Sequence, residues 1–226
     1  MELINVKKVI YIMAILSSHF SMWGQKVPVP ENYTIISKVM GDLDKDGVKE
    51  LVVAYNTKTP EDELDNVARA LIIYKLVNNK WSEWKKSEQA LYGSADGGMM
   101  GDPFGSIEIK NGILLVMQQG GSSWKWEITD KYRFQNGNFY LIGYTSVSGK
   151  PCEYWDNIDF NLSTGKMLVK REYEKCNNHS EEKIYKIEKE ILYKKGLKIT
   201  LQTRDEKEIK IVTPKYHREI YIAMGT

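Results

Sequence analysis

Short apolar stretches separated by turn residues run along most of the chain, and this pattern predicts strands rather than long helices. Asn111–Gly112 and Asn136–Gly137 are the strongest local signals, because an Asn-Gly pair between two apolar runs is typical of a two-residue hairpin. The predicted strands cover residues 51–55, 70–77, 80–84, 106–110, 113–118, 124–134, 139–144, 155–161 and 166–173. The pattern therefore predicts a mainly β fold, an antiparallel meander of hairpins with few short helices.

The last part of the chain, residues 183–224, fits two kinds of element. Ile184, Ile187 and Ile191 match one face of a helix about as well as they match a strand. Turn residues near positions 195 and 204 favour strands, so we expect the meander to continue. No low-complexity linker divides residues 25–226, which predicts a single β-rich domain with a sub-boundary near residue 150.

Residues 1–24 differ from the rest of the chain. Lys7 and Lys8 precede an apolar run at residues 9–16, and small and polar residues follow it. This order is typical of a secretory signal peptide cleaved before Gln25, while the alternative is a buried N-terminal helix. The apolar run is too short to span a bilayer. We therefore expect an exported protein, periplasmic or secreted, with no transmembrane segment in its mature form.

Charge and composition narrow the classes of partner. The 226 residues are 42% hydrophobic and 27% charged, with a formal net charge of +2. That balance is ordinary for a globular protein and gives no electrostatic reason to expect a nucleic acid partner. The chain has 14 Tyr and 6 Trp, which suit strands and also suit binding to sugars or peptides.

Two cysteines, Cys152 and Cys176, both lie after the expected cleavage site. An exported protein meets oxidising conditions, in which a disulfide persists. We therefore predict a bridge between them, which would contribute about 3 kcal/mol to stability by restricting the unfolded chain. Two free thiols are the alternative.

The segment from Gly41 to Glu50 carries the clearest chemistry. Its carboxylates stand at alternate positions, and a glycine at position 47 permits the sharp turn that folds them round one point. Calcium prefers about six to eight oxygen ligands at about 2.3–2.6 Å, and this spacing supplies such ligands. The expected set for Ca²⁺ consists of side chains of Asp42, Asp44, Asp46 and Glu50 and the carbonyl of Val48. The alternative is a solvated acidic turn that holds no ion.

The acidic loop leads into a strand rather than a helix. An EF-hand needs a bidentate Glu at its twelfth position, and here that position is Val53, inside an apolar run. The stretch Gly-Asp-Leu-Asp-Lys-Asp-Gly-Val-Lys-Glu-Leu-Val-Val, residues 41–53, instead resembles the calcium loop of FG-GAP and VCBS-type repeats. The resemblance implies a structural calcium between strands and a role as a scaffold or adhesion surface.

The sequence holds a single copy of this loop, whereas a propeller repeats its motif in several blades. We therefore expect a β domain that uses the loop, and not a complete propeller. Residues 102–144 also resemble small exported bacterial proteins that carry one such loop, a resemblance that implies no particular activity.

Two glycine-rich segments, residues 94–105 and 120–123, flank one predicted hairpin and can wall a cleft. Trp124 and Trp126 alternate with a lysine, so both rings are expected on one face. With Asp102 they form a candidate ligand surface, since paired Trp side chains beside polar loops suit stacking on a sugar ring or a peptide. The alternative places both Trp in the core.

Two functions from different classes follow. The first is a non-catalytic binding or scaffold module, stabilised by calcium, whose partner is a glycan, a cell-wall component or a protein. The second is an exported glycan hydrolase, which needs a carboxyl with a raised pKa in a cleft. Asp96, Asp102 and Glu108 are the acids near the glycine-rich segments. The sequence has no His-x-x-x-His pair and no Gly-x-Ser-x-Gly, the signatures of zinc peptidases and serine hydrolases.

Overall fold

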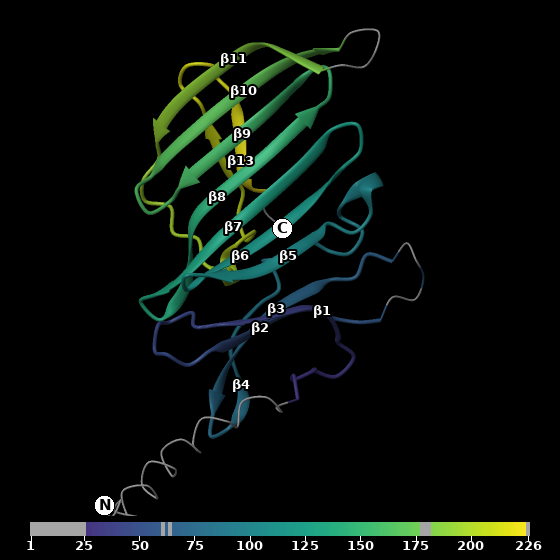
Figure 1. The fold of residues 1–226 in the computed structure, drawn as a ribbon, viewed down its shortest axis with the longest axis vertical. Helices are drawn as coiled ribbons and strands as arrows, with labels where there is room; N and C mark the ends of the chain where they lie inside the picture. Colours follow the sequence, from purple (N-terminus) through teal and green to yellow (C-terminus); the bar gives the residue numbers. More distant parts are fainter. Residues whose placement is uncertain (1–25, 60–61, 63–64, 177–181, 225–226) are drawn as a thin grey trace, which may run out of the picture.

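A computed structural model describes residues 26–59, 62, 65–176 and 182–224, so the predicted signal peptide, residues 1–24, lies outside the described residues. The described chain consists mainly of strands in three antiparallel sheets (Figure 1). Its helical structure is limited to two 3-10 turns, η2 (Gly98–Met100) and η3 (Leu201–Thr203). The predicted mainly β, antiparallel fold with few short helices is therefore confirmed, and the sheets do not form a propeller.

Sheet A contains four strands in sequence order. They are β1 (Thr34–Gly41), β2 (Glu50–Asn56), β3 (Arg69–Val77) and β4 (Lys80–Ser87). All of β2 up to Tyr55 is buried, as expected for a continuous apolar run that is covered on both faces. One face joins the main core, and the residues before β1 cover the other, where the Tyr55 hydroxyl donates a hydrogen bond to the Pro28 carbonyl.

Sheet B contains seven strands and is a continuous meander, because each strand pairs with its neighbours in sequence. They are β5 (Phe104–Lys110), β6 (Ile113–Gly121), β7 (Lys125–Gln135), β8 (Asn138–Lys150), β9 (Tyr154–Asn161), β10 (Lys166–Cys176) and β11 (Glu182–Tyr193). The Asn-Gly pairs occupy tight turns as predicted. Asn111 and Gly112 have φ values of 55° and 75°, and Asn136 and Gly137 have values of 50° and 80°. Positive φ at both turn residues matches the twist of the strands.

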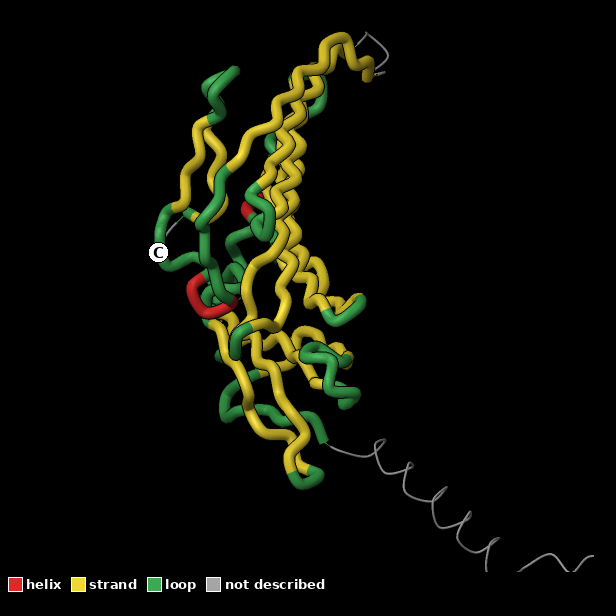
Figure 2. The backbone as a smooth tube through the Cα atoms, turned by 90° about the vertical axis from the view of Figure 1, so that its left-hand side faces the viewer, coloured by secondary structure: helices red, strands yellow, loops and turns green. Residues whose placement is uncertain are grey.

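Sheet C consists of β12 (Ile209–Val212) and β13 (Glu219–Ala223) and lies against one face of sheet B (Figure 2). The chain forms strands here, as expected, but it leaves the meander after β11 and returns to cover it. The reason is apolar burial, since Ile211, Ile220 and Ile222 join the main core. We call the covered face of sheet B the inner face.

One cluster of buried apolar side chains joins the three sheets. It includes Val52 of sheet A, Phe160 of sheet B and Ile220 of sheet C. Sheet A meets sheet B where β1 passes β5, and a Cβ on Gly41 would lie 2.6 Å from Cγ2 of Ile109. This close approach explains the glycine at the end of β1, just before the acidic loop.

Two links hold together segments that are far apart in sequence. Cys152, in the turn after β8, is bonded to Cys176 at the end of β10 with their Cα atoms 5.1 Å apart, which confirms the predicted pairing. Arg204 is buried and donates hydrogen bonds both to Asp130 of β7 and to the carbonyl of Ile222 in β13, so it holds sheet C against sheet B.

In the described part of the chain, no helix is long and apolar enough to cross a membrane.

Candidate functional site

The acidic loop joins β1 to β2 beside the junction of sheets A and B. Asp42 organises its turn, since its two carboxylate oxygens accept hydrogen bonds from the amides of Lys45 (2.6 Å) and Gly47 (3.0 Å). Gly47 has a φ of 89°, a backbone conformation that favours glycine. The side chain of Leu43 is buried in the main core and anchors the loop.

Three carboxylates of the loop converge. One oxygen from each of Asp42, Asp44 and Glu50 lies within 4.8 Å of the other two. Glu50 is 1% exposed, and its Oε2 accepts a hydrogen bond of 2.7 Å from the amide of Leu43. Burial raises the pKa of Glu50 despite this hydrogen bond, and the charge of Asp44 raises it further. The loop therefore concentrates negative charge at a partly buried point.

A lysine from β3 balances part of this charge. The Nζ atom of Lys75 forms an ion pair with Asp44 and lies 3.4 Å from Asp46 Oδ2 and 3.9 Å from Glu50 Oε1. The same atom lies 4.3 Å from the centre of the Trp84 ring. Burial opposes protonation, but the hydrogen bond to Asp44 and the nearby charges raise the pKa of Lys75 overall, so its ammonium group is charged.

The donor set is chemically suited to calcium, because carboxylate oxygens are the hard ligands that this cation prefers. Of the predicted ligands, Asp42, Asp44 and Glu50 come together, whereas Asp46 is exposed and accepts a hydrogen bond of 2.8 Å from the amide of Val48. This hydrogen bond lowers the pKa of Asp46. Asp42, Asp44 and Glu50 would hold a calcium ion at the point where the chain enters β2.

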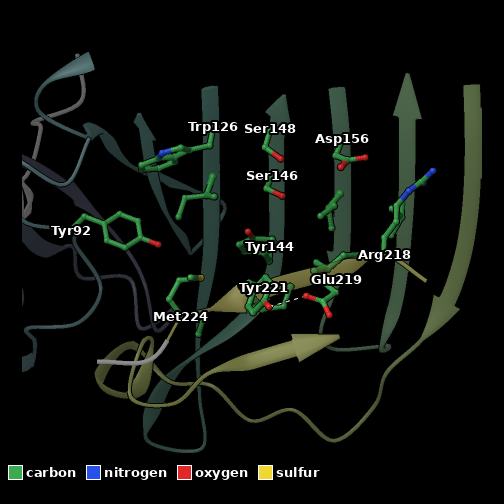
Figure 3. Close-up of a pocket in the computed structure, with 16 residues that line it drawn as sticks. Tyr92, Trp126, Tyr144, Ser146, Ser148, Asp156, Arg218, Glu219, Tyr221 and Met224 are labelled. Atoms are coloured by element: carbon green, nitrogen blue, oxygen red, sulfur yellow. Dashed lines mark hydrogen bonds between the residues drawn. The ribbon is translucent and has the colours of Figure 1, made fainter. Parts of the chain in front are cut away.

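A cleft of about 460 Å³ opens between the inner face of sheet B and sheet C (Figure 3). Strands β7, β8 and β9 provide one wall, and β13 provides the opposite wall. Its polar and aromatic lining includes Tyr92, Trp126, Ser146, Ser148, Asp156 and Tyr221. Apart from Trp126, these residues belong to no recognisable sequence motif, so only Trp126 was predicted from the sequence.

The register of sheet B explains how these side chains meet. Trp126 pairs with Ser148, and Ser148 pairs with Asp156, so the three form one row across β7, β8 and β9 (Figure 3). Residues that are directly opposite on neighbouring strands project from the same face. In the next row, Ile128 pairs with Ser146, which adds a second hydroxyl beside apolar surface.

The charged side chains at the cleft are engaged with partners. Asp156 accepts hydrogen bonds of 2.7 and 2.5 Å from Nε and Nη2 of Arg171. Glu219 pairs with Lys210 and accepts a hydrogen bond of 3.0 Å from the hydroxyl of Tyr221. The hydrogen bonds from Lys210 and Tyr221 lower the pKa of Glu219. The cleft therefore offers aromatic surfaces and hydroxyl groups, with its acids held in ion pairs.

The two predicted Trp residues have different environments. Trp126 lines the cleft, and its ring packs edge-on against Tyr92 with ring centres 5.6 Å apart. Trp124 is 42% exposed, and its ring centre lies 5.0 Å from that of Tyr154 on β9. The sequence left open whether Trp126 belongs to a ligand surface or to the core, and the structure shows both contacts. The side chain packs against the main core and also lines the cleft.

The acids considered for a hydrolase do not line this cleft. Asp102 forms an ion pair with the buried side chain of Arg69 and accepts a hydrogen bond from the Phe104 amide. Partial burial alone would raise the pKa of Asp102, but the hydrogen bonds from Arg69 and from the Phe104 amide lower it overall. Asp96 is exposed and binds the side chain of Asn66. Glu108 pairs with a neighbouring lysine on β5. Asp102 therefore belongs neither to the cleft nor to a general-acid environment.

The two glycine-rich segments contact each other. The amide of Gly121 donates a hydrogen bond of 2.8 Å to the carbonyl of Gly97. A Cβ on Gly97 would lie 2.0 Å from the carbonyl oxygen of Gly101, and a Cβ on Gly120 would lie 2.6 Å from the Trp126 ring. The glycines therefore permit the close packing that positions Trp126 beside the cleft.

No protein-family model matches the chain, and a comparison with curated proteins finds no match. The functional assignment therefore depends on the geometry of the acidic loop and the cleft.

Proposed function

We propose that the protein is a non-catalytic binding module that holds a sugar ring in the cleft between sheets B and C. The observation that carries this proposal is the lining, which combines aromatic rings and hydroxyl groups while its acids are held in ion pairs. A sugar ring has apolar C–H faces and hydroxyl edges, so it can stack on Trp126 and bond to Ser146 and Ser148. The volume of about 460 Å³ suits a small-molecule site.

The same lining favours binding over hydrolysis. Glycoside hydrolysis needs one carboxyl whose pKa is raised so that it donates a proton at neutral pH. In the cleft, the pKa of Glu219 is lowered by the hydrogen bond from Lys210, and Asp156 binds Arg171 through two hydrogen bonds. Carboxylates held in ion pairs in this way can orient a ligand but are poor proton donors.

The affinity of the Ser148→Tyr variant for glycans tests whether the cleft is the binding site. The larger side chain would project into the row between Trp126 and Asp156, so we expect affinity for any glycan bound by the wild type on a glycan array to fall by about 10-fold or more. Val147→Tyr is the matched control, because Val147 is the next residue of β8 and is 38% exposed on the opposite face.

Two results would contradict the proposal. One is unchanged glycan affinity in Ser148→Tyr when its melting temperature equals that of the control. The other is wild-type protein that binds no glycan on the array.

We also propose that calcium at the acidic loop stabilises the junction between sheets A and B. The convergence of Asp42, Asp44 and Glu50 favours this second role. The loop lies close to the β5–β6 turn, since a Cβ on Gly112 would lie 3.3 Å from the carbonyl oxygen of Asp42. If the protein is exported, as residues 1–24 indicate and the disulfide supports, a dissociation constant on the order of 10⁻⁴–10⁻³ M suffices outside the cell.

Thermal melting with and without calcium tests this role. A ligand at 100 times its dissociation constant stabilises the native state by about 2.7 kcal/mol, which raises the melting temperature by several degrees. We expect that rise in excess CaCl₂ relative to EGTA, and we expect Asp44→Ala to abolish it. Glu108→Ala is a control acid outside the loop. Equal melting temperatures of the wild type in CaCl₂ and EGTA would contradict the calcium site.

A further inference from the structure

Beyond the cleft, a row of aromatic rings crosses sheet B. Trp124, Tyr154, Tyr173 and Tyr185 belong to the turn before β7 and to strands β9, β10 and β11. Their successive ring centres lie 5.0, 6.1 and 6.2 Å apart. We refer to these four side chains as the aromatic row. Trp124 is 42% exposed and Tyr185 is 53% exposed, so both ends of the row are open to solvent.

Polar contacts hold the middle of the aromatic row in place. The guanidinium carbon of Arg171 lies 3.8 Å from the centre of the Tyr154 ring, and two hydrogen bonds to Asp156 fix the guanidinium there. The hydroxyl of Tyr173 donates a hydrogen bond of 3.0 Å to Glu188. Side chains that are already held in one position lose little freedom on binding, so this surface is preorganised.

The aromatic row is continuous with the cleft. Asp156 lines the cleft and binds Arg171, and Arg171 stacks on Tyr154. In the register of sheet B, Tyr154 pairs with Tyr173 two residues along from the pair of Asp156 and Arg171. Both pairs therefore project from the inner face. A chain molecule that leaves the cleft past Asp156 meets the aromatic row next.

Two observations select the class of ligand. First, β9 and β10 pair with strands on both sides, so an extended peptide could add only at the edge strand β11, where it would run parallel to the strands and not along the row that crosses them. Second, carboxylates lie among the cations of this surface, since Asp156 pairs with Arg171 and Glu188 pairs with both Lys186 and Arg218, while Lys175 stacks on the Tyr185 ring. These carboxylates would repel the phosphates of a polyanion such as single-stranded nucleic acid.

From this geometry we infer that the protein binds an uncharged polysaccharide chain, with one sugar in the cleft and the following sugars along the aromatic row. Sugar rings have apolar faces that stack on aromatic side chains and hydroxyl edges that bond to the ion-paired groups between them. The inference rests on the proposed sugar-binding function and extends it from one ring to a chain.

The test measures the affinity of the full chain for uncharged oligosaccharides of increasing length by calorimetry. The probes are β-1,4-linked glucose and β-1,4-linked N-acetylglucosamine, each as a dimer and a hexamer. We expect the hexamer of one series to bind about 10-fold more tightly than its dimer. Tyr185→Ala, at the end of the row farthest from Trp124, should remove most of that gain and leave dimer binding unchanged. Tyr193→Ala should change neither, because Tyr193 is 67% exposed and lies on the opposite face of β11. The pairing skips Tyr185 at the irregularity between Tyr173 and Glu174, which shifts the alternation of faces along the strand.

The outcomes separate this inference from the proposed function. Equal affinity for dimer and hexamer, with Ser148→Tyr still weakening the binding of both, would overturn the extended site and leave the cleft intact. No binding of either series at any length would overturn the inference. The glycan array with the wild-type protein would then decide whether the cleft binds a sugar at all. Tighter binding to oligo(dT) than to either hexamer would identify a nucleic acid surface and overturn the polysaccharide assignment.

Discussion

At the scale of single residues, Lys75 changes the chemistry of a loop that lies 31 positions earlier in the sequence. Its ammonium group lies among the carboxylates of Asp44, Asp46 and Glu50, where a bound calcium ion would also interact. A divalent cation and an ammonium group repel each other, so they compete for these oxygens. Lys75 would therefore stabilise the loop without calcium and weaken calcium binding.

We expect Lys75→Met to have two opposite effects. Calcium affinity, measured by calorimetry, should rise by about 10-fold because the competing charge is removed. The melting temperature in EGTA should fall, because the three carboxylates lose their counter-ion.

Lys38→Met provides a matched control, since Lys38 is exposed on β1 and forms none of these contacts. If Lys75→Met and the wild type had the same calcium affinity, Lys75 would be a counter-ion that calcium does not displace.

At the scale of secondary-structure elements, turns were easier to predict than sites. Asn111–Gly112 and Asn136–Gly137 were identified because their preference for positive φ is a local property. Similarly, Asp42, Asp44 and Glu50 were identified because one short loop brings them together. The cleft is different, since pairing between strands decides whether alternating residues face inward or outward.

The element that carries the aromatic row is constrained by the disulfide. The Cys152–Cys176 bond joins the turn before β9 to the end of β10, and these strands carry Tyr154 and Tyr173. Replacing both cysteines by serine should lower the free energy of unfolding by about 3 kcal/mol, because the unfolded chain gains freedom. Urea denaturation measures this change.

Reduction of the wild type with dithiothreitol should reproduce the loss of stability in the double-serine variant. If both the reduced protein and the variant unfolded at the wild-type urea concentration, the bond would contribute nothing to stability.

At the scale of the whole molecule, the fold class was predictable and the arrangement of the sheets was not. Period-two patterns and turn residues identify strands, and a meander follows when each strand pairs with the next. No local signal places sheet C on the inner face, because that contact depends on residues such as Arg204 and Asp130, which lie 74 positions apart. The second wall of the cleft was therefore beyond sequence analysis.

The buried pair of Arg204 and Asp130 also has a consequence for the order of assembly. Sheet B needs only pairing between consecutive strands, so it can form progressively during synthesis. The cleft needs β13, the last described strand, to dock afterwards through Arg204. A ligand bound as proposed would contact both walls of the cleft and would bind only the docked form, so ligand binding and docking of sheet C would stabilise each other. Partly assembled chains would therefore keep their sheets while remaining unable to retain a ligand.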